Sequence, residues 1–321
     1  MQNITDNYST IIFFSLFNLL SFFIIGKYKG KIFFLIDRPD GVRKLHLKSV
    51  FAVGGLFVAN YLSLILLYAH FFDLKTLFAI SLTSLTIFLI GLLDDIFSIN
   101  AYKKLLIIAI IILAVLNFND DLKINFLYFS TFEQSIYLGK YSTLVTTLCL
   151  LLLINCFNLS DGINALATGI SIIWVLFAYF YTLPELQIIL FPLIFLLFLI
   201  FFSIYKGNFF LGDNGSLVIS CFIGLVIIFT YNINTQQNPG IISVESIFIL
   251  FMVPGIDMFR LFVQRLLKKQ DPFQGDRDHL HHLLMDKFSL KISLFLYFSL
   301  MLIFIFSEKF KLIQSAYEMI A

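Results

Sequence analysis

Several acidic residues of this chain stand where apolar segments end. Asp94 and Asp95 close the stretch GLLDDIF (91–97), after a long apolar run without another acid. An ionised side chain in hydrocarbon is costly, and acids at the C-terminal end of a helix oppose its macrodipole. A metal ion or a cationic partner would compensate both effects, and paired carboxylates offer the oxygen ligands that suit Mg²⁺. The alternative is a helix end that reaches water.

Two further polar stretches carry acids beside glycines. Asp213 lies between glycines in FLGDNGS (210–216). This pattern favours a tight turn whose backbone approaches a phosphate, with Asp213 as a metal ligand. Asn155, Asn158 and Asp161 in NCFNLSDGINALATG (155–169) recur at steps of three and would share one face of a continuing helix. For both stretches, a Gly/Asn turn with a helix N-cap is the alternative.

The stretch DPFQGDRDHLHHLL (271–284) places three of the five histidines within four positions. His279, His281 and His282 follow Arg277, a combination that favours binding of an anionic diphosphate. A zinc site is disfavoured because no cysteine is near. A basic loop beside anionic lipid explains the nearby Lys268 and Lys269 but not the histidines.

The composition predicts the setting of these stretches. Of 321 residues, 60% are hydrophobic and 13% are charged, and the mean hydropathy is +0.93. These values indicate one all-α polytopic membrane domain, residues 1–321, embedded in a lipid bilayer, and nothing indicates nucleic-acid binding. Ten apolar runs approach the length of a bilayer span, with an eleventh helix not excluded: 10–26, 50–69, 75–93, 104–118, 142–157, 165–182, 186–204, 215–231, 243–262 and 291–307.

The distribution of charge predicts the orientation of these spans. Alternate loops hold 17 of the 22 Lys and Arg residues, and the positive-inside rule makes those loops cytoplasmic, with both termini outside. Eleven of the 15 Asp residues lie on this face or at its edge, whereas all five Glu lie on the other face. The acidic and histidine stretches therefore meet at one membrane face.

In order and spacing, these stretches resemble the polyprenyl-phosphate N-acetylhexosamine-1-phosphate transferases. That family includes the enzymes that start O-antigen, common antigen and teichoic acid linkage units, and the related phospho-MurNAc-pentapeptide translocase. The resemblance runs from Asp37 to Leu284 and includes a first loop, DRPDGVRKLHLKSVFAVGG (37–55), with the pattern D-x-P…RK-x-H…GG. The other shared patterns are G-x-x-DD, N-x-x-N-x-x-DG, FLGD-x-GS and DR-x-H-x-HH.

The resemblance implies a reaction and roles for the residues. A sugar 1-phosphate passes from a UDP-N-acetylhexosamine to undecaprenyl phosphate at the bacterial inner membrane, with release of UMP and with Mg²⁺, or alternatively Mn²⁺, as cofactor. Asp213 is then the first metal ligand, while Asp94 and Asp95 supply a second ligand and a contact to the lipid phosphate. Asp161 acts with them in catalysis. The substrate-binding set is Lys44, His46, Asn155, Asn158, Asn164, Arg277, His279, His281 and His282.

The chain departs from the family pattern at several positions. DGINA replaces the usual DG-x-DG, so Asn164 and Ala165 stand for Asp and Gly, and Ser49 and Phe51 replace prolines. Asn164 can still hydrogen-bond a uracil, but a contribution to metal binding or catalysis is in doubt. A catalytically impaired member and a lipid or ion transporter remain alternatives, although a transporter would carry ionisable residues near the midplane. The sugar, the polymer and the assembly, including a homodimer, stay open.

Overall fold

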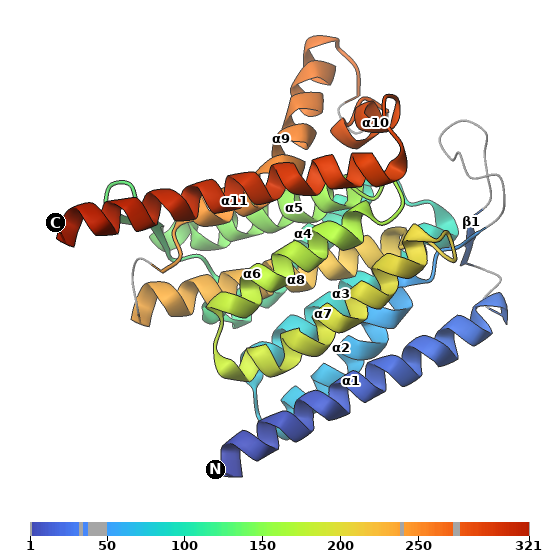
Figure 1. The fold of residues 1–321 in the computed structure, drawn as a ribbon, viewed down its shortest axis with the longest axis horizontal. Coiled ribbons are helices and arrows are strands. Elements are labelled where there is room, and N and C mark those ends of the chain that lie inside the picture. Colours follow the sequence, from blue (N-terminus) through green and yellow to red (C-terminus); the bar gives the residue numbers. More distant parts are fainter. Residues whose placement is uncertain (1, 32–34, 38–49, 238–240, 272–276, 321) are drawn as a thin grey trace.

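The computed structural model describes residues 2–31, 35–37, 50–237, 241–271 and 277–320. Helices dominate these residues (Figure 1). Their bounds are α1 Gln2–Tyr28, α2 Gly54–Phe71, α3 Lys75–Phe97, α4 Ala101–Phe118, α5 Ser142–Leu159, α6 Leu166–Tyr181, α7 Pro184–Tyr205, α8 Gly212–Gln237, α9 Val244–Leu267, α10 Leu280–Met285 and α11 Leu290–Ile320. Short 3-10 turns lie at Lys29–Lys31, Asp120–Leu122 and Gly139–Tyr141.

The long helices correspond one to one with the ten predicted spans. Within the described residues, nine helices are long and apolar enough to cross a membrane, and α6 is a shorter apolar helix. The prediction of an all-α polytopic membrane protein is confirmed. The side of the membrane on which each loop lies stays a prediction. Most helix ends differ from the predicted bounds by a few residues, but α1 begins at Gln2 instead of 10, and α11 ends at Ile320 instead of 307. Helix α8 begins at Gly212, so Asp213 belongs to its first turn.

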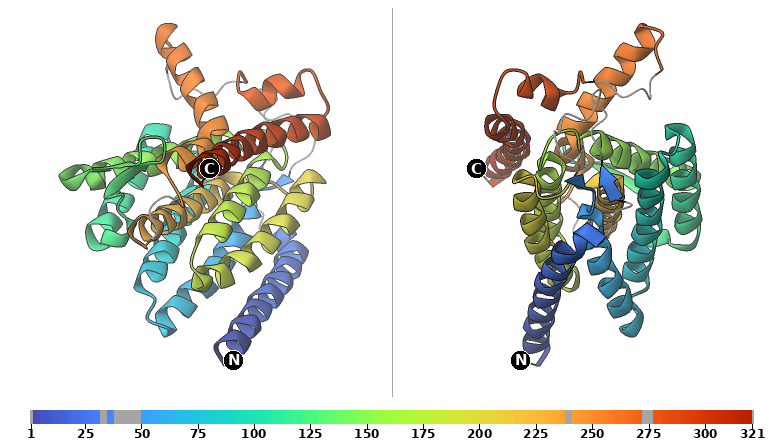
Figure 2. Two further views of the ribbon diagram at one scale, coloured as in Figure 1. Left: turned by 60° about the vertical axis from the view of Figure 1, so that its left-hand side comes forward. Right: turned by 90° about the vertical axis from the view of Figure 1, so that its right-hand side faces the viewer.

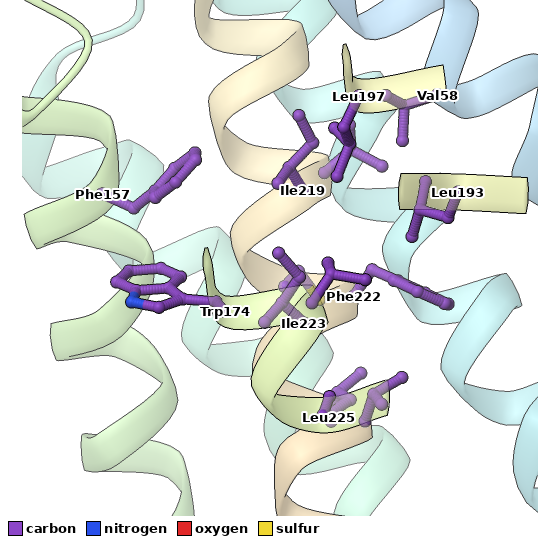
Figure 3. Close-up of a cluster of buried hydrophobic side chains, with 14 of the residues drawn as sticks. Val58, Phe157, Trp174, Leu193, Leu197, Ile219, Phe222, Ile223 and Leu225 are labelled. Atoms are coloured by element: carbon purple, nitrogen blue, oxygen red, sulfur yellow. The ribbon is translucent and has the colours of Figure 1, made fainter. Parts of the chain in front are cut away.

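Helix α8 forms the centre of the bundle and packs against α2, α3, α5 and α6. Figure 3 shows apolar side chains of α8, such as Ile219 and Phe222, among side chains of the surrounding helices. Trp174 of α6 is fully buried there, and its indole N–H donates to the Leu250 carbonyl at 3.1 Å. Because buried aromatic and aliphatic side chains interlock at close-packed density, this core fixes α8 relative to its neighbours.

Glycines let three helices meet closely at the end of α8 that carries Asp213. A Cβ added to Gly91 of α3 would lie 2.5 Å from the Asp213 carbonyl oxygen, and one added to Gly55 of α2 would lie 2.5 Å from the Gly215 nitrogen. Both distances are shorter than real contacts allow, so only glycine permits these approaches. The close packing brings the carboxylates of α3 and α8 to one place.

Two small hairpins complete the described chain. Strand β1 (Ile36–Asp37) pairs antiparallel with β2 (Val50–Phe51), and β3 (Phe126–Phe129) pairs antiparallel with β4 (Gln134–Tyr137). The first hairpin adjoins the start of α8, because the Phe210 N–H donates to the Phe51 carbonyl at 2.8 Å. The second lies at the opposite end of the bundle, where Glu245 accepts the backbone N–H groups of Ser130 and Thr131.

Helix α9 differs from the other spans in its projection from the bundle. It contains Pro254, and its C-terminal part projects beyond the bundle in both views of Figure 2, together with α10. Proline removes one helical hydrogen bond and favours a change of helix direction. His281 of α10 contacts Gly162 in the turn that follows α5.

Candidate active site

A lysine joins two of the predicted acids. The Lys104 Nζ of α4 lies 2.5 Å from an Asp94 carboxylate oxygen and 3.1 Å from an Asp213 carboxylate oxygen. The Lys104 side chain is 15% exposed and that of Asp94 is 6% exposed. A cation therefore compensates Asp94 at the C-terminal end of α3, in the way that the sequence requires. Asp94 also accepts the Ile99 N–H at 2.6 Å, which fixes its carboxylate at the helix end.

Asp95 faces a different element from Asp94. Its two carboxylate oxygens accept the backbone N–H groups of Asp213 and Asn214, each at 2.9 Å, and the Asn214 side chain also donates to it. A carboxylate at a helix N-terminus is favoured by unpaired N–H groups and by the macrodipole. Asp95 thus holds the first turn of α8, and with it Asp213, against α3.

Asn158 reaches the same site from α5. Its side-chain amide donates to an Asp213 carboxylate oxygen at 2.6 Å and to the Ser216 hydroxyl at 2.8 Å. Helix α5 ends at Leu159, so Asp161 lies in the following turn and not on a continued helix face. Asn155 points elsewhere, because its amide lies 3.3 Å from the Met258 sulfur of α9. The structure brings Asn158 to Asp213 and leaves Asn155 away from that carboxylate.

Asp161 lies close enough to Asp213 and Asp95 for their negative charges to affect its ionisation. Withdrawal from water raises its pKa well above the ordinary value, and the negative charges of Asp213 and Asp95 add to the shift, although part of its surface is exposed. Carboxylates in such proximity disfavour each other's ionisation. The site therefore favours positive charge beyond that of Lys104.

The histidines approach the turn that carries Asp161. His279 and His281 are buried, and a Cβ added to Gly162 would lie 2.2 Å from the His281 Nε2 and 3.0 Å from the His282 Nε2. Burial is the main cause that lowers the pKa of His281 to about 3, with His282 and His279 adding to the shift. The His281 Nε2 is buried without a hydrogen-bond partner among the described residues. A buried ring nitrogen without a partner requires an explanation, such as a bound water, an ion or a functional role.

The remaining predicted residues have different positions. Asn164 lies in the same turn as Asp161, and Ala165 after it has a φ of 67°, the left-handed conformation that glycine adopts without steric cost. Alanine at the family's glycine position therefore keeps a backbone that suits glycine. Arg277 is exposed. Lys44 and His46 lie outside the described residues.

Two residues of this region are not predicted from the sequence. In the charge pattern Lys104 is one loop cation among many, although it begins an apolar span ten residues after Asp94. Asp257 of α9 is buried beside His279, with 2.9 Å between its carboxylate and the His279 Nδ1. An acid within the predicted span 243–262 is itself a signal of function.

Comparison with known proteins gives a consistent result. The model of the family described as glycosyl transferase family 4 matches residues 77–231. A Bacillus subtilis protein named probable undecaprenyl-phosphate N-acetylglucosaminyl 1-phosphate transferase is 26% identical, over 78% of this chain and 69% of its own length. Proteins named undecaprenyl-phosphate alpha-N-acetylglucosaminyl 1-phosphate transferase are 27% identical in Thermotoga maritima, over 84% of this chain and 80% of the relative, and 28% in Escherichia coli K12, over 84% and 74%. Over residues 77–231, the chain is thus similar to glycosyl transferase family 4.

The matched range of glycosyl transferase family 4 includes Asp94, Lys104, Asp161 and Asp213. The histidines and Asp257 lie beyond it, and they join the site only through the fold of α9 and α10. The family match therefore covers the acidic centre, while the histidine side of the site depends on the contacts described above.

The acidic centre fits a divalent metal ion. Asp94 and Asp213 direct carboxylate oxygens at one ammonium group, so they converge on a position suited to a cation. Among the described residues, no three His, Cys, Asp or Glu side chains are grouped so that they could hold a metal by themselves. Mg²⁺ is commonly bound through one or two carboxylates together with waters and substrate phosphates, so this donor set suits it.

Proposed function

We propose that this protein transfers N-acetylglucosamine 1-phosphate from UDP-N-acetylglucosamine to undecaprenyl phosphate and releases UMP. The convergence of Asp94, Lys104, Asp213 and Asn158 at one end of a membrane bundle carries the proposal. One substrate is confined to the bilayer and the other is a soluble nucleotide, so their reaction needs a site where apolar helices meet water. The names of the relatives support this donor sugar and acceptor lipid.

The proposed step forms one phosphorus–oxygen bond and breaks another. A phosphate oxygen of undecaprenyl phosphate attacks the β-phosphorus of the UDP-sugar, and the bond from that phosphorus to the bridging oxygen breaks, so that UMP leaves with the electron pair. A phosphate monoester has a second pKa of about 6 and is largely dianionic at neutral pH. Catalysis therefore needs positioning and charge neutralisation more than a general base.

The acidic centre is suited to this neutralisation. Asp213 and Asp94 would hold Mg²⁺, which when bound would supply positive charge at the diphosphate. Lys104 places an ammonium group between the same two carboxylates, and the approach of a substrate phosphate gives it a third anionic partner. Asp95 maintains the position of Asp213 through the first turn of α8. With these roles, the centre would hold the lipid phosphate and the diphosphate of the UDP-sugar next to each other.

The turn after α5 and the histidine segment would form the donor side of the site. The His281 Nε2 packs against Gly162, which sets the histidine segment on this turn, and it has no hydrogen-bond partner among the described residues. Asn158, Asp161 and Asn164 would order the nucleotide, and His279, His282 and Arg277 would contribute polar contacts. The predicted cytoplasmic orientation would put this side at the inner face of the bacterial cytoplasmic membrane, where lipid-linked surface glycans begin.

UMP release by the purified full-length protein tests the proposal. In detergent, we expect release that requires undecaprenyl phosphate, Mg²⁺ or Mn²⁺, and UDP-N-acetylglucosamine, and that stops on chelation of the metal. UDP-N-acetylgalactosamine and a UDP-6-deoxy-N-acetylhexosamine complete the panel. Release with another sugar alone would overturn the donor assignment. Absence of release from folded protein that binds UDP-sugar would favour an impaired member and direct attention to Asn164→Asp.

Replacement of Gly162 tests the contact between the turn after α5 and the histidines. A methyl group in Gly162→Ala would collide with His281, which is buried and has little room to move, so overpacking should displace the histidine. We expect UMP release to fall by about tenfold or more, on the view that a misplacement of about 1 Å is costly in catalysis. Gly26→Ala is the control, because no atom lies within 4 Å of a Cβ there. Full activity of Gly162→Ala would remove the histidines from the site.

A further inference from the structure

Asp257 is a buried acid with several hydrogen-bond donors around it. One carboxylate oxygen accepts from the Arg260 guanidinium at 2.9 Å and from the Leu280 N–H at 3.0 Å. The other lies 2.9 Å from the His279 Nδ1 and 3.1 Å from the Leu280 nitrogen. Asp257 is 8% exposed and His279 is 5% exposed. The carboxylate thus joins the projecting part of α9 to the segment that carries the histidines.

We propose that Asp257 is the positioning residue of the histidine side of the site, and that it fixes the proton of His279 on Nδ1. An ionised carboxylate only accepts hydrogen bonds, so the ring nitrogen that faces it must be the donor. A carboxylate that accepts from one imidazole nitrogen sets the tautomer and orientation of the ring. Arg260 also donates to the Asp278 carbonyl, which holds the backbone just before His279.

His279 is linked by direct contacts to the turn after α5, which carries Asp161 and Gly162. The His279 and His281 rings stack with their centroids 5.5 Å apart and an angle of 8° between the planes. His281 in turn lies against Gly162 and beside His282, whose ring centroid is 4.3 Å away. A change at Asp257 therefore reaches the turn of Asp161 through two rings that have little freedom to move.

Asparagine at position 257 has nearly the same shape but should reverse the tautomer. Two donors, Arg260 and the Leu280 N–H, meet the Oδ1 side of the carboxylate, so the amide oxygen should face them. The amide NH₂ then faces His279 and donates to Nδ1, which becomes an acceptor, and the imidazole proton moves to Nε2. The isosteric change thus alters the position of a proton without opening a cavity.

The decisive measurement is the ¹⁵N spectrum of histidine-labelled full-length protein in detergent at about pH 8, above the ordinary histidine pKa. The His279 signals are identified by their loss in His279→Gln. We expect a protonated Nδ1 in the unchanged protein and an unprotonated Nδ1 in Asp257→Asn. Glu245→Gln is the matched control, because Glu245 begins the same helix and caps backbone N–H groups at its other end. It should leave the His279 signals unchanged. An unprotonated Nδ1 in the unchanged protein overturns the proposal even if Asp257→Asn does not fold.

Kinetics give a second test, which rests on the proposed function. We expect Asp257→Asn to lower kcat for UMP release by about 10- to 100-fold, the usual effect of removing a partner that orients a functional histidine. The KM for undecaprenyl phosphate should not change. Because Asp257 acts through His279, the double variant with His279→Gln should be no slower than His279→Gln alone. Multiplying effects would overturn the proposal. A lack of UMP release by the unchanged protein would overturn the proposed function and leave the tautomer measurement valid.

Discussion

Asp213→Asn should abolish UMP release, with a loss of at least about 1,000-fold in kcat/KM. In the proposed mechanism Asp213 would hold the metal that neutralises the diphosphate, and a loss of about 4 kcal/mol of stabilisation corresponds to this factor. The amide cannot restore the contacts, because Lys104 donates to one carboxylate oxygen and Asn158 to the other. Whichever way the asparagine turns, its NH₂ group faces a donor. UMP release at saturating Mg²⁺ and at several UDP-sugar concentrations is the measurement.

The control for Asp213→Asn is the same substitution at Asp121. That residue accepts the Thr76 hydroxyl at 3.0 Å at the start of α3, the opposite end of the helix from Asp94. Asp121→Asn should retain the activity of the unchanged protein. Thermal unfolding of both variants separates loss of function from loss of fold. More than a tenth of the original activity in folded Asp213→Asn would contradict its assignment to the metal and the diphosphate.

The spans were predictable because a bilayer demands long apolar helices, whatever their neighbours. The convergence of the acidic stretches was predictable as well, since alternate loops of a membrane bundle share a face. The different contacts of Asp94 and Asp95 were not predictable. Successive helix residues point about 100° apart, so one faces Lys104 and the other faces α8, and only the packing of α3 decides which.

Lys104 and Asp257 show the other limit of the sequence. A lysine at the start of an apolar span is ordinarily a topology signal, and its approach to Asp94 depends on how α4 returns along α3. Asp257 gave a signal, as an acid within an apolar run, but its partner His279 is 22 residues away across a loop. A pattern cannot locate such a partner, because the pairing is made by the folding of α9 and α10 together.

Lys104→Met should lower kcat for UMP release by about 100-fold, the usual effect of removing one preorganised group that stabilises transition-state charge. Methionine keeps the apolar stem and removes the ammonium group, so Asp94 and Asp213 face each other without the cation that now lies between them. If Lys104 acts on the diphosphate, additional Mg²⁺ cannot replace it. A Mg²⁺ titration of UMP release should therefore reach a plateau about 100-fold below that of the unchanged protein.

Lys103→Met is the matched control, since Lys103 is the adjacent lysine and is exposed. It should retain full activity. The loss in Lys104→Met would then be due to the position of Lys104 and not to the removal of any positive charge at this helix end. Lys104→Arg keeps the charge but changes its shape, and we expect partial activity because the longer, planar guanidinium fits the space of the compact ammonium group less well. Full recovery of Lys104→Met at high Mg²⁺ would show that Lys104 only neutralises the carboxylates in the absence of metal. The proposed action of Lys104 on the reacting phosphates would then be wrong.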